Sequence, residues 1–375
     1  MLIGVPKECK DGEFRVGMTP DGVAALVKRG HRILVQRDAG QRIGFCDADY
    51  QAAGATIVEG ASDIYSAELI VKVKELQPEE IPFLQSGQII FAYLHIAPDP
   101  DLAKAMLSAN VIGIAYETVR NRHGTLPLLA PMSMIAGRLA ISVGAWGLQL
   151  HNGGKGTLLS GGPNLPPGRV LVLGAGNAGS HATDVAVGLG ANITVLDINA
   201  EKLTRQKKIH GDRIMTAAAT PENIAREITQ TDLIVGAILN PGKLAPKIIT
   251  RAMLRNSEPG TVLVDICIDQ GGLGETSRPS SHAVPFYLDE GVVHYCVGNM
   301  PSAVARSATL ALATATLPYV EKLADHGLAK LCTEDSGFAG GVQIFRGHVS
   351  HPDIARDLDM PYSSLDSLLR QSNPC

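Results

Sequence analysis

Short runs of β-branched and other apolar residues recur along the chain, and stretches with helical spacing separate them. Alternation of this kind predicts βαβ units, in which parallel strands form a sheet and helices cover both of its faces. We therefore expect an α/β protein with doubly wound, Rossmann-like sheets. The expected strands are LIGVP (2–6), RILVQ (32–36), LIVKVK (69–74), IIFAYL (89–94), VIGIAYE (111–117), VLVLGAG (170–176), ITVLDI (193–198), LIVGAI (233–238) and TVLVDI (261–266).

A segment in the middle of the chain interrupts this alternation. Residues 151–169, HNGGKGTLLSGGPNLPPGR, are rich in Gly and Pro and predict a loop. The preceding residues 131–150 have apolar side chains all round a helix, which is typical of a buried helix that connects two domains. The C-terminal part is helical in pattern, and we expect it to return to the first domain. The predicted domains are residues 1–130 with 306–375 for the substrate and 131–305 for a nucleotide.

A glycine-rich turn follows VLVL and opens a helix. Gly174 permits the tight turn, Gly176 lets the backbone approach a pyrophosphate, and Gly179 allows the helix to pack on the strand. The helix N-terminus offers N–H groups to the phosphates, and Asp197 ends the next strand, where a carboxylate binds the adenosine ribose. Because Asp197 repels the 2′-phosphate of NADP, we expect NAD. The nearby Lys202 weakens this preference slightly.

Four polar residues are candidates for handling a substrate. Arg15 lies in EFRVGMTP, and Lys74, His95 and Asp269 lie at the carboxyl ends of predicted strands, where open α/β sheets bind their ligands. The first three belong to the first predicted domain and Asp269 to the nucleotide domain. We therefore expect an active-site cleft that the two domains flank.

Each candidate also has a purely structural interpretation. Arg15 is then a surface charge, and one of Lys72 and Lys74 extends to solvent. His95 is then a hydrogen-bonded core histidine, and Asp269 caps the loop that follows it. The residues taken singly leave both interpretations open.

Charge and composition narrow the class of partner. The formal net charge is −4 and the basic residues are scattered, which argues against nucleic acid and an anionic membrane surface. Charged residues in MLIGVPKECKDGEFR argue against a secretory signal, and no run is apolar enough to span a bilayer, so we expect a cytoplasmic protein. The six cysteines are isolated, which favours reduced thiols, and the Cys and His spacing predicts no metal site.

Taken together, the motifs resemble those of the NAD-dependent L-alanine dehydrogenases, from the first residues to about residue 325. The matching segments are IGVPKE, EFRVGMTP, DADY, AAGA, VKVKE, YLHIA, LLAPMSMIAGRLA, GAGNAG, LDIN, PGKLAPK, VDICIDQGG and VGNMPSAV. The resemblance implies reversible oxidative deamination of L-alanine to pyruvate and ammonium, in a homohexamer. It implies that Arg15 and Lys74 bind the substrate carboxylate, that His95 acts on the carbonyl or the attacking water, and that Asp269 assists proton transfer. Which of His95 and Asp269 is the principal base stays open.

The same resemblance implies the residues that hold NAD. Two positions depart from the family pattern: Asn177 stands where Thr is common, and MTAAAT (215–220) has Ala where Ser is frequent. The tail after about residue 330 matches poorly and implies nothing. The implied cofactor contacts are Ser133, Gly174, Gly176, Asn177, Ala178, Gly179, Asp197, Lys202, Ile238, Leu239, Ile266, Asp269, Val297, Asn299 and Met300.

Three other functions remain in competition. The NAD-binding subunit of the transhydrogenases is similar in fold, but its counterparts of VKVKE and YLHIA generally lack the lysine and histidine present here. An opine-type or lysine-pathway dehydrogenase also acts on an amine-linked carboxylate. For alanine we expect a small pocket lined by Tyr93, Leu129 and Met132. A protein that binds NAD without catalysis is the third alternative.

Overall fold

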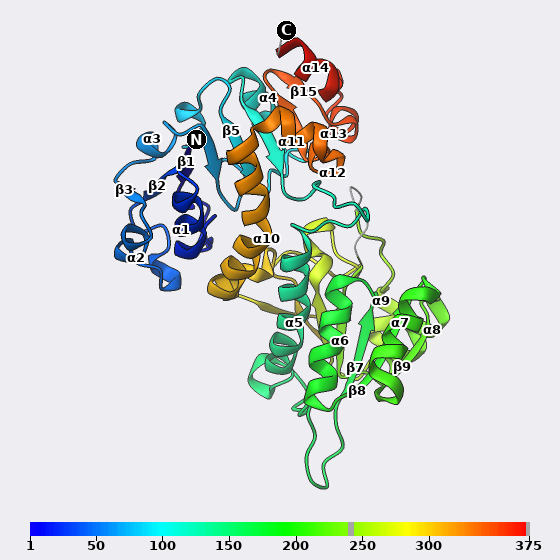
Figure 1. The fold of residues 1–375 in the computed structure, drawn as a ribbon. Helices are drawn as coiled ribbons and strands as arrows, with labels where there is room; N and C mark the ends of the chain where they lie inside the picture. The colour runs from blue at the N-terminus through cyan, green and yellow to red at the C-terminus, as the bar shows by residue number, and fades with distance from the viewer. Residues whose placement is uncertain (239–243, 373–375) are drawn as a thin grey trace. The chain divides into compact units, whose positions relative to one another are not determined.

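The computed structural model describes residues 1–238 and 244–372 (Figure 1). The chain divides into two compact units. The first contains Met1–Met132 and Val304–Cys375, and the second contains Ser133–Ala303. The chain therefore enters the second unit within helix α5 (Ala130–Gly147) and leaves it just before helix α10 (Ala305–His326).

The first unit is built on an eight-stranded sheet with the order β15-β14-β6-β5-β4-β1-β2-β3. Strands β1 to β6 are parallel, whereas β14 runs antiparallel to β6 and pairs with β15. The strands are β1 (Leu2–Val5), β2 (Arg32–Gln36), β3 (Thr56–Val58), β4 (Leu69–Val71), β5 (Ile89–Ala92), β6 (Ile112–Ala115), β14 (Val342–Phe345) and β15 (His348–Val349). The helices, besides α10, are α1 (Pro20–Lys28), α2 (Asp47–Ala52), α3 (Ala61–Ile64), α4 (Pro100–Ser108), α11 (Leu328–Glu334), α12 (Ser336–Ala339), α13 (Pro352–Asp357) and α14 (Leu365–Ser372), with 3-10 helices at Gln41–Ile43 and Ile81–Phe83.

The second unit is built on a seven-stranded sheet with the order β12-β13-β11-β10-β7-β8-β9. Its strands are parallel except for β12. The strands are β7 (Arg169–Leu173), β8 (Asn192–Asp197), β9 (Ile214–Ala218), β10 (Leu233–Gly236), β11 (Val262–Asp265), β12 (Phe286–Asp289) and β13 (Val292–Tyr295). The helices, besides α5, are α6 (Asn177–Leu189), α7 (Ala200–His210), α8 (Pro221–Ile228) and α9 (Arg251–Arg255), with 3-10 helices at Leu150–Asn152, Gly211–Arg213, Ile266–Gln270 and Met300–Val304.

The two sheets share one topology. If the parallel strands of each unit are numbered in chain order, both sheets have the order 3-2-1-4-5-6, which is that of dinucleotide-binding folds. The order reverses between β1 and β4 in the first unit and between β7 and β10 in the second. Ligands of such sheets bind at the carboxyl ends of the strands next to this reversal. The segments that follow these four strands are therefore the places where a site is expected.

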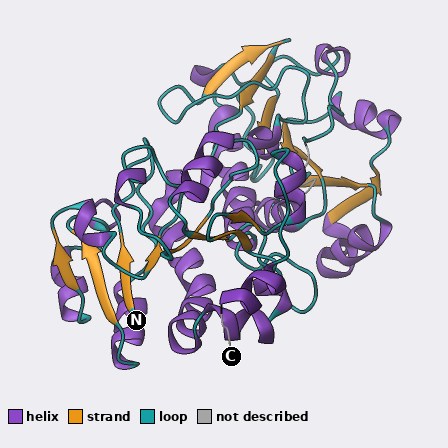
Figure 2. Ribbon diagram, turned by 90° about the horizontal axis from the view of Figure 1, so that it is seen from above, coloured by secondary structure: helices purple, strands orange, loops and turns teal. Residues whose placement is uncertain are grey.

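Helices pack on both faces of the second sheet, and Figure 2 shows the helices and strands of the chain in different colours. Alternate residues of a strand point to opposite faces, and those of β7 belong to two different cores. Val170 and Val172 pack in one core with Ala182 of α6, whereas Leu171 packs in the other with Ile224 of α8. The sheet is thus doubly wound, and its central strands are apolar throughout because both of their faces are buried.

The predicted α/β class and all nine predicted strands are confirmed. The C-terminal segment departs from its purely helical prediction, because β14 and β15 extend the first sheet antiparallel to β6. The helix over 131–150 is not buried all round: Arg138, Ser142 and Trp146, four residues apart, form an exposed stripe on α5. Within the described residues, no helix has the length and apolar character needed to cross a bilayer.

Candidate functional site

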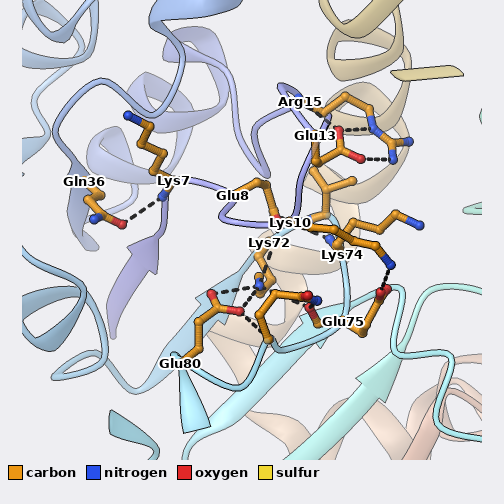
Figure 3. Close-up of polar contacts among 12 residues, drawn as sticks. Lys7, Glu8, Lys10, Glu13, Arg15, Gln36, Lys72, Lys74, Glu75 and Glu80 are labelled. Carbon is orange, nitrogen blue, oxygen red and sulfur yellow. Dashed lines mark hydrogen bonds and ion pairs between the residues drawn. The ribbon is translucent and has the colours of Figure 1, made fainter. Parts of the chain in front are cut away.

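Arg15 follows strand β1 and lies in the interior of the first unit. It is only 2% exposed, and Glu13 binds one edge of its guanidinium through both carboxylate oxygens, with Nε to Oε1 at 2.7 Å and Nη2 to Oε2 at 2.5 Å (Figure 3). Its Nη1 lies 3.0 Å from Sδ of Met132. Burial by itself lowers the pKa of Arg15, but the hydrogen bonds and charge of Glu13 outweigh it, so the pKa is raised. Arg15 is therefore a fixed, buried cation and not a surface charge.

Lys74 follows strand β4 and is half-buried. Within the described residues its Nζ has no hydrogen-bond acceptor. Burial lowers its pKa, and the nearby cations Arg15 and Lys10 lower it further against the opposing charge of Glu75. An ammonium that is partly desolvated beside other cations favours an incoming anion. Arg15 and Lys74 thus form a pair of positive groups suited to a carboxylate.

Lys72 has a different environment from Lys74, although the two are only two residues apart. It is completely buried, and its Nζ donates to Glu80 Oε1 at 2.8 Å and Oε2 at 2.6 Å. Figure 3 shows it between the carboxylates of Glu80 and Glu8. The structural interpretation in which Lys72 extends to solvent is therefore wrong.

His95 lies three residues beyond strand β5, and its side chain is exposed. Its backbone has a φ of +45°, a left-handed conformation that few side chains adopt. Glu117, after β6, accepts hydrogen bonds from His95 N at 2.8 Å and from Leu94 N at 3.2 Å. The imidazole stacks on the ring of Tyr93, with centroids 6.0 Å apart. His95 is thus not a core histidine, and its main chain is anchored by a carboxylate.

Contacts connect the expected pocket residues of the first unit. Tyr93 is buried, stacks on His95 and donates its hydroxyl to Leu128 O at 2.6 Å. Met132 is buried against Arg15. Electrostatic interactions of Arg15 with Tyr93 and with Lys74 join these contacts, so the first unit brings together Arg15, Lys74, His95, Tyr93 and Met132. Leu129 is half-buried.

The glycine turn of the second unit has the shape that a pyrophosphate requires. Gly174 has a φ of +106°, and a Cβ there would lie 2.5 Å from Ala237 O. A Cβ on Gly179 would lie 1.8 Å from Gly174 O, so the close packing of α6 on the turn requires glycine. A Cβ on Gly176, in contrast, would have no neighbouring atom within 4 Å, so the space beside this residue is open. The residues present therefore fit a dinucleotide whose phosphates approach Gly176 and the N-terminus of α6.

Asp197 connects this turn to the end of β8. The carboxylate is buried, and it accepts hydrogen bonds from Ala175 N at 2.6 Å and Asn199 N at 2.7 Å. A carboxylate has about four acceptor positions, so it retains capacity for ribose hydroxyls. Lys202 lies on α7 with its side chain exposed. The carboxylate is thus fixed beside the glycine turn.

Asp269 lies in the 3-10 helix Ile266–Gln270 after β11, and its side chain is exposed. Its Oδ2 accepts a hydrogen bond from Asn299 N at 3.2 Å. The capping role considered for Asp269 belongs to Asp265, which is fully buried and accepts from Cys267 N at 3.1 Å and Leu273 N at 2.7 Å. Asp269 therefore links the segments that follow β11 and β13.

The remaining predicted cofactor residues lie around these strand ends or at the start of α5 and α6. Val297 and Met300 have side chains in the hydrophobic core, so their main chains are what they offer a ligand. Ile238 is held by Cys267, whose Sγ lies 3.2 Å from Ile238 N and 3.0 Å from Ile238 O. Leu239 lies outside the described residues. Half-buried Ser133 and Ile266, together with Asn177 and Ala178 in α6, complete the set.

The carboxylates that support these groups were not among the residues predicted from the sequence. Glu13 and Glu8 bracket the loop after β1, Glu117 follows β6, and Asp265 ends β11. Only Glu13 carries a local signal, because it lies two residues from Arg15. Within residues 1–238 and 244–372, no group of three His, Cys, Asp or Glu side chains is placed to hold a metal ion.

The chain matches two family models. The model described as "Alanine dehydrogenase/PNT, N-terminal domain" matches residues 4–136, and "Alanine dehydrogenase/PNT, C-terminal domain" matches residues 140–352. The alanine dehydrogenase of Halomonas elongata is 47% identical over 370 residues, which cover 98% of this chain and 100% of that protein. The alanine dehydrogenase of Staphylococcus haemolyticus is 44% identical over 372 residues, 99% of this chain and 100% of that protein.

Solved structures agree with these matches. An L-alanine dehydrogenase superposes with a TM-score of 0.93 at 43% identity, covering 96% of this chain and 99% of that one. A transhydrogenase from Sinorhizobium meliloti superposes with a TM-score of 0.81 at 24% identity, covering 94% and 99%, and shares the fold. The chain belongs to the alanine dehydrogenase/PNT family.

Proposed function

We propose that this protein is an NAD-dependent L-alanine dehydrogenase, which converts L-alanine reversibly to pyruvate and ammonium. Near full-length similarity to alanine dehydrogenases at 44–47% identity supports the activity. The observation that carries the substrate class is the half-buried Lys74 ammonium, which has no acceptor among the described residues and lies beside the buried Arg15. Two such cations favour a small carboxylate.

The two units divide the binding of substrate and cofactor. The first unit, with Arg15, Lys74 and His95, binds alanine or pyruvate. The second unit binds NAD through the glycine turn, Asp197 and the ends of β10, β11 and β13. We assign the substrate role, predicted for residues 1–130 with 306–375, to the unit of residues 1–132 with 304–375, and the nucleotide role, predicted for residues 131–305, to the unit of residues 133–303.

Arg15 and Lys74 orient the substrate through its carboxylate. Arg15 is held rigidly by Glu13, so the orientation of its guanidinium is preorganised, and Lys74 adds a positive charge. Bound NAD supplies the hydride acceptor for the Cα hydrogen of alanine. His95 handles the proton at the carbonyl oxygen or the attacking water, for which an imidazole is suited near neutral pH. Asp269 assists proton transfer from the nucleotide side.

Asp197 determines the choice of NAD over NADP. Its carboxylate is buried and fixed by two main-chain N–H groups beside the glycine turn. A phosphate on the 2′ position of the ribose would meet this negative charge at close range. The exposed side chain of Lys202 offsets the repulsion only slightly.

The proposal includes a homo-oligomer, a hexamer by family resemblance, in the cytoplasm. Large apolar side chains are exposed at the C-terminal end of α5 and in the loop that follows, namely Trp146, Leu150, Leu158 and Leu165. A group of exposed apolar side chains of this kind supports contact with another protein surface.

A substrate panel tests the proposed activity. NADH formation is measured with NAD and L-alanine, L-serine, glycine or L-lysine at mildly alkaline pH. We expect turnover with L-alanine and its closest analogues. Turnover with L-lysine in preference to alanine would identify a lysine-pathway dehydrogenase. NADH binding without any turnover would identify a transhydrogenase-like subunit or a binding protein.

A further inference from the structure

Glu8 lies where the pairing of two neighbouring strands ends. Strands β1 and β4 are parallel and pair at Ile3 with Leu69 and at Gly4 with Ile70. Beyond these pairs, the chain after β1 reaches Glu8 and the chain after β4 reaches Lys74. This is also the position where the strand order of the sheet reverses.

The Glu8 carboxylate replaces the missing strand partner. Its Oε1 accepts from Val73 N at 2.6 Å and lies 3.4 Å from Lys74 N. On the other side of the segment, pairing with the chain around β5 continues, since Tyr93 N donates to Val73 O at 3.1 Å. A buried N–H group without an acceptor is destabilising, because it has lost its hydrogen bonds to water. Glu8 therefore holds the main chain of Val73 and Lys74 on the side where pairing with β1 has ended.

A buried ion pair supports Glu8 in this position. Oε2 of Glu8 lies 3.6 Å from Nζ of Lys72, and Lys72 is anchored by Glu80, which in turn accepts from Tyr65 Oη at 2.8 Å. Burial raises the pKa of Glu8, and the charge of Lys72 opposes this shift. Lys72 is thus paired with two carboxylates, whereas the Lys74 ammonium has no hydrogen-bond acceptor among the described residues.

We propose that Glu8 is a positioning residue for Lys74: its carboxylate holds the Val73–Lys74 main chain and so places the Lys74 ammonium beside Arg15. This inference rests on the proposed function, in which Lys74 binds the substrate carboxylate. It assigns Glu8 the role of a hydrogen-bond acceptor for the main chain. A side chain at position 8 that keeps an acceptor oxygen at hydrogen-bond distance from Val73 N should therefore keep Lys74 in place, even without a negative charge.

Three variants separate this role from a general contribution to folding. Glu8→Met removes the acceptor at similar size, Glu8→Gln keeps an acceptor oxygen, and Glu79→Met is a matched control at an exposed glutamate in the same part of the chain. The KM for pyruvate, the KM for NADH and the Tm are measured for each. We expect Glu8→Met to raise the KM for pyruvate roughly tenfold while the KM for NADH stays constant. We expect Glu8→Gln to recover most of the loss and Glu79→Met to resemble the wild type.

A double-mutant cycle tests whether Glu8 acts through Lys74. The kcat/KM for pyruvate is measured for Glu8→Met, Lys74→Ala and the double variant. We expect Glu8→Met to add little in the Lys74→Ala background, and an undiminished, additive loss would overturn the proposal. If Glu8→Met fails to fold, Glu8→Asp, which is one methylene shorter and withdraws the acceptor, takes its place in the same cycle.

The outcomes distinguish this inference from the proposed function. An unchanged KM for pyruvate in a folded Glu8→Met or Glu8→Asp enzyme, together with normal wild-type turnover of alanine, overturns the positioning role alone. An absence of wild-type turnover with alanine and with pyruvate overturns the proposed function and the positioning role with it.

Discussion

Glu13 binds Arg15 through two parallel hydrogen bonds in the interior of the first unit, at 2.7 and 2.5 Å, and both side chains are almost fully buried. The carboxylate compensates the buried charge and fixes the plane of the guanidinium. The position of Arg15 is therefore set by a neighbour two residues away before any substrate arrives.

Because Glu13 compensates the buried charge of Arg15, we expect Glu13→Gln to lower the free energy of unfolding of the protein. Removal of one partner leaves an uncompensated buried cation, which costs about 3–5 kcal/mol. We expect a clearly lower Tm and a lower kcat/KM for alanine, measured by thermal unfolding and steady-state kinetics. Glu79→Gln, at an exposed position, is the control. Equal Tm values for the two variants would show that Arg15 does not depend on Glu13.

Lys74 predicts a pH dependence of pyruvate binding. Its pKa is lowered from the ordinary value of 10.5, chiefly by burial. Only the charged form attracts a carboxylate, so affinity is present below the lowered pKa and is lost as the pH rises through it, earlier than for an ordinary lysine. The Kd of pyruvate for the NADH complex, measured from neutral to alkaline pH, checks this. A Kd that stays constant up to pH values above that ordinary pKa contradicts the assigned role.

Lys74→Ala separates the two binding functions. The substitution removes the ammonium from the first unit, whereas NAD is assigned to the second. We expect turnover to fall severely and NADH affinity, measured by fluorescence titration, to remain nearly constant. A comparable loss of NADH affinity would mean that Lys74 is not a substrate residue.

His95→Gln is expected to reduce turnover by roughly 10²–10⁴-fold, the range for loss of a general acid–base group. Because the imidazole is exposed, the Tm should change little. His123→Gln, at another exposed histidine of the first unit, is the matched control. Activity within a few-fold of wild type would remove His95 from the proton chemistry.

Asp197→Gly is expected to relax the preference against NADP, because it removes the carboxylate that repels the 2′-phosphate. NAD affinity should fall as well, since Ala175 N loses its acceptor. The ratio of kcat/KM for NAD and NADP is the measurement. An unchanged ratio would indicate that Lys202 or another group decides the preference, and Lys202→Ala then tests that possibility.

Much of the architecture could be predicted from periodicity. Strands β4, β5 and β11 are apolar runs buried on both faces, so their ends, and with them Lys74, His95 and Asp269, could be located in advance. Strand β9 escaped prediction because its residues are largely exposed or half-buried. Strands β14 and β15 are short and pair antiparallel, which the helical pattern of the C-terminal segment conceals.

The supporting carboxylates could not be predicted in the same way. Glu8 contacts Val73 and Glu117 contacts His95, and each contact joins segments that are distant in sequence. The local sequence around each residue does not indicate such a partner, because the two residues come into contact only when the chain folds and the neighbouring strands pair. The burial of Lys72 rather than Lys74 in ion pairs likewise depends on the positions of Glu8 and Glu80.

The proposed activity is the oxidation of L-alanine to pyruvate with NAD. The most direct measurement incubates the purified protein with L-alanine and NAD and quantifies NADH, pyruvate and ammonium together. We predict equal amounts of all three, and consumption of NADH when pyruvate and ammonium are supplied instead. NADH without matching pyruvate and ammonium, or no NADH from a protein that binds it, would contradict the account.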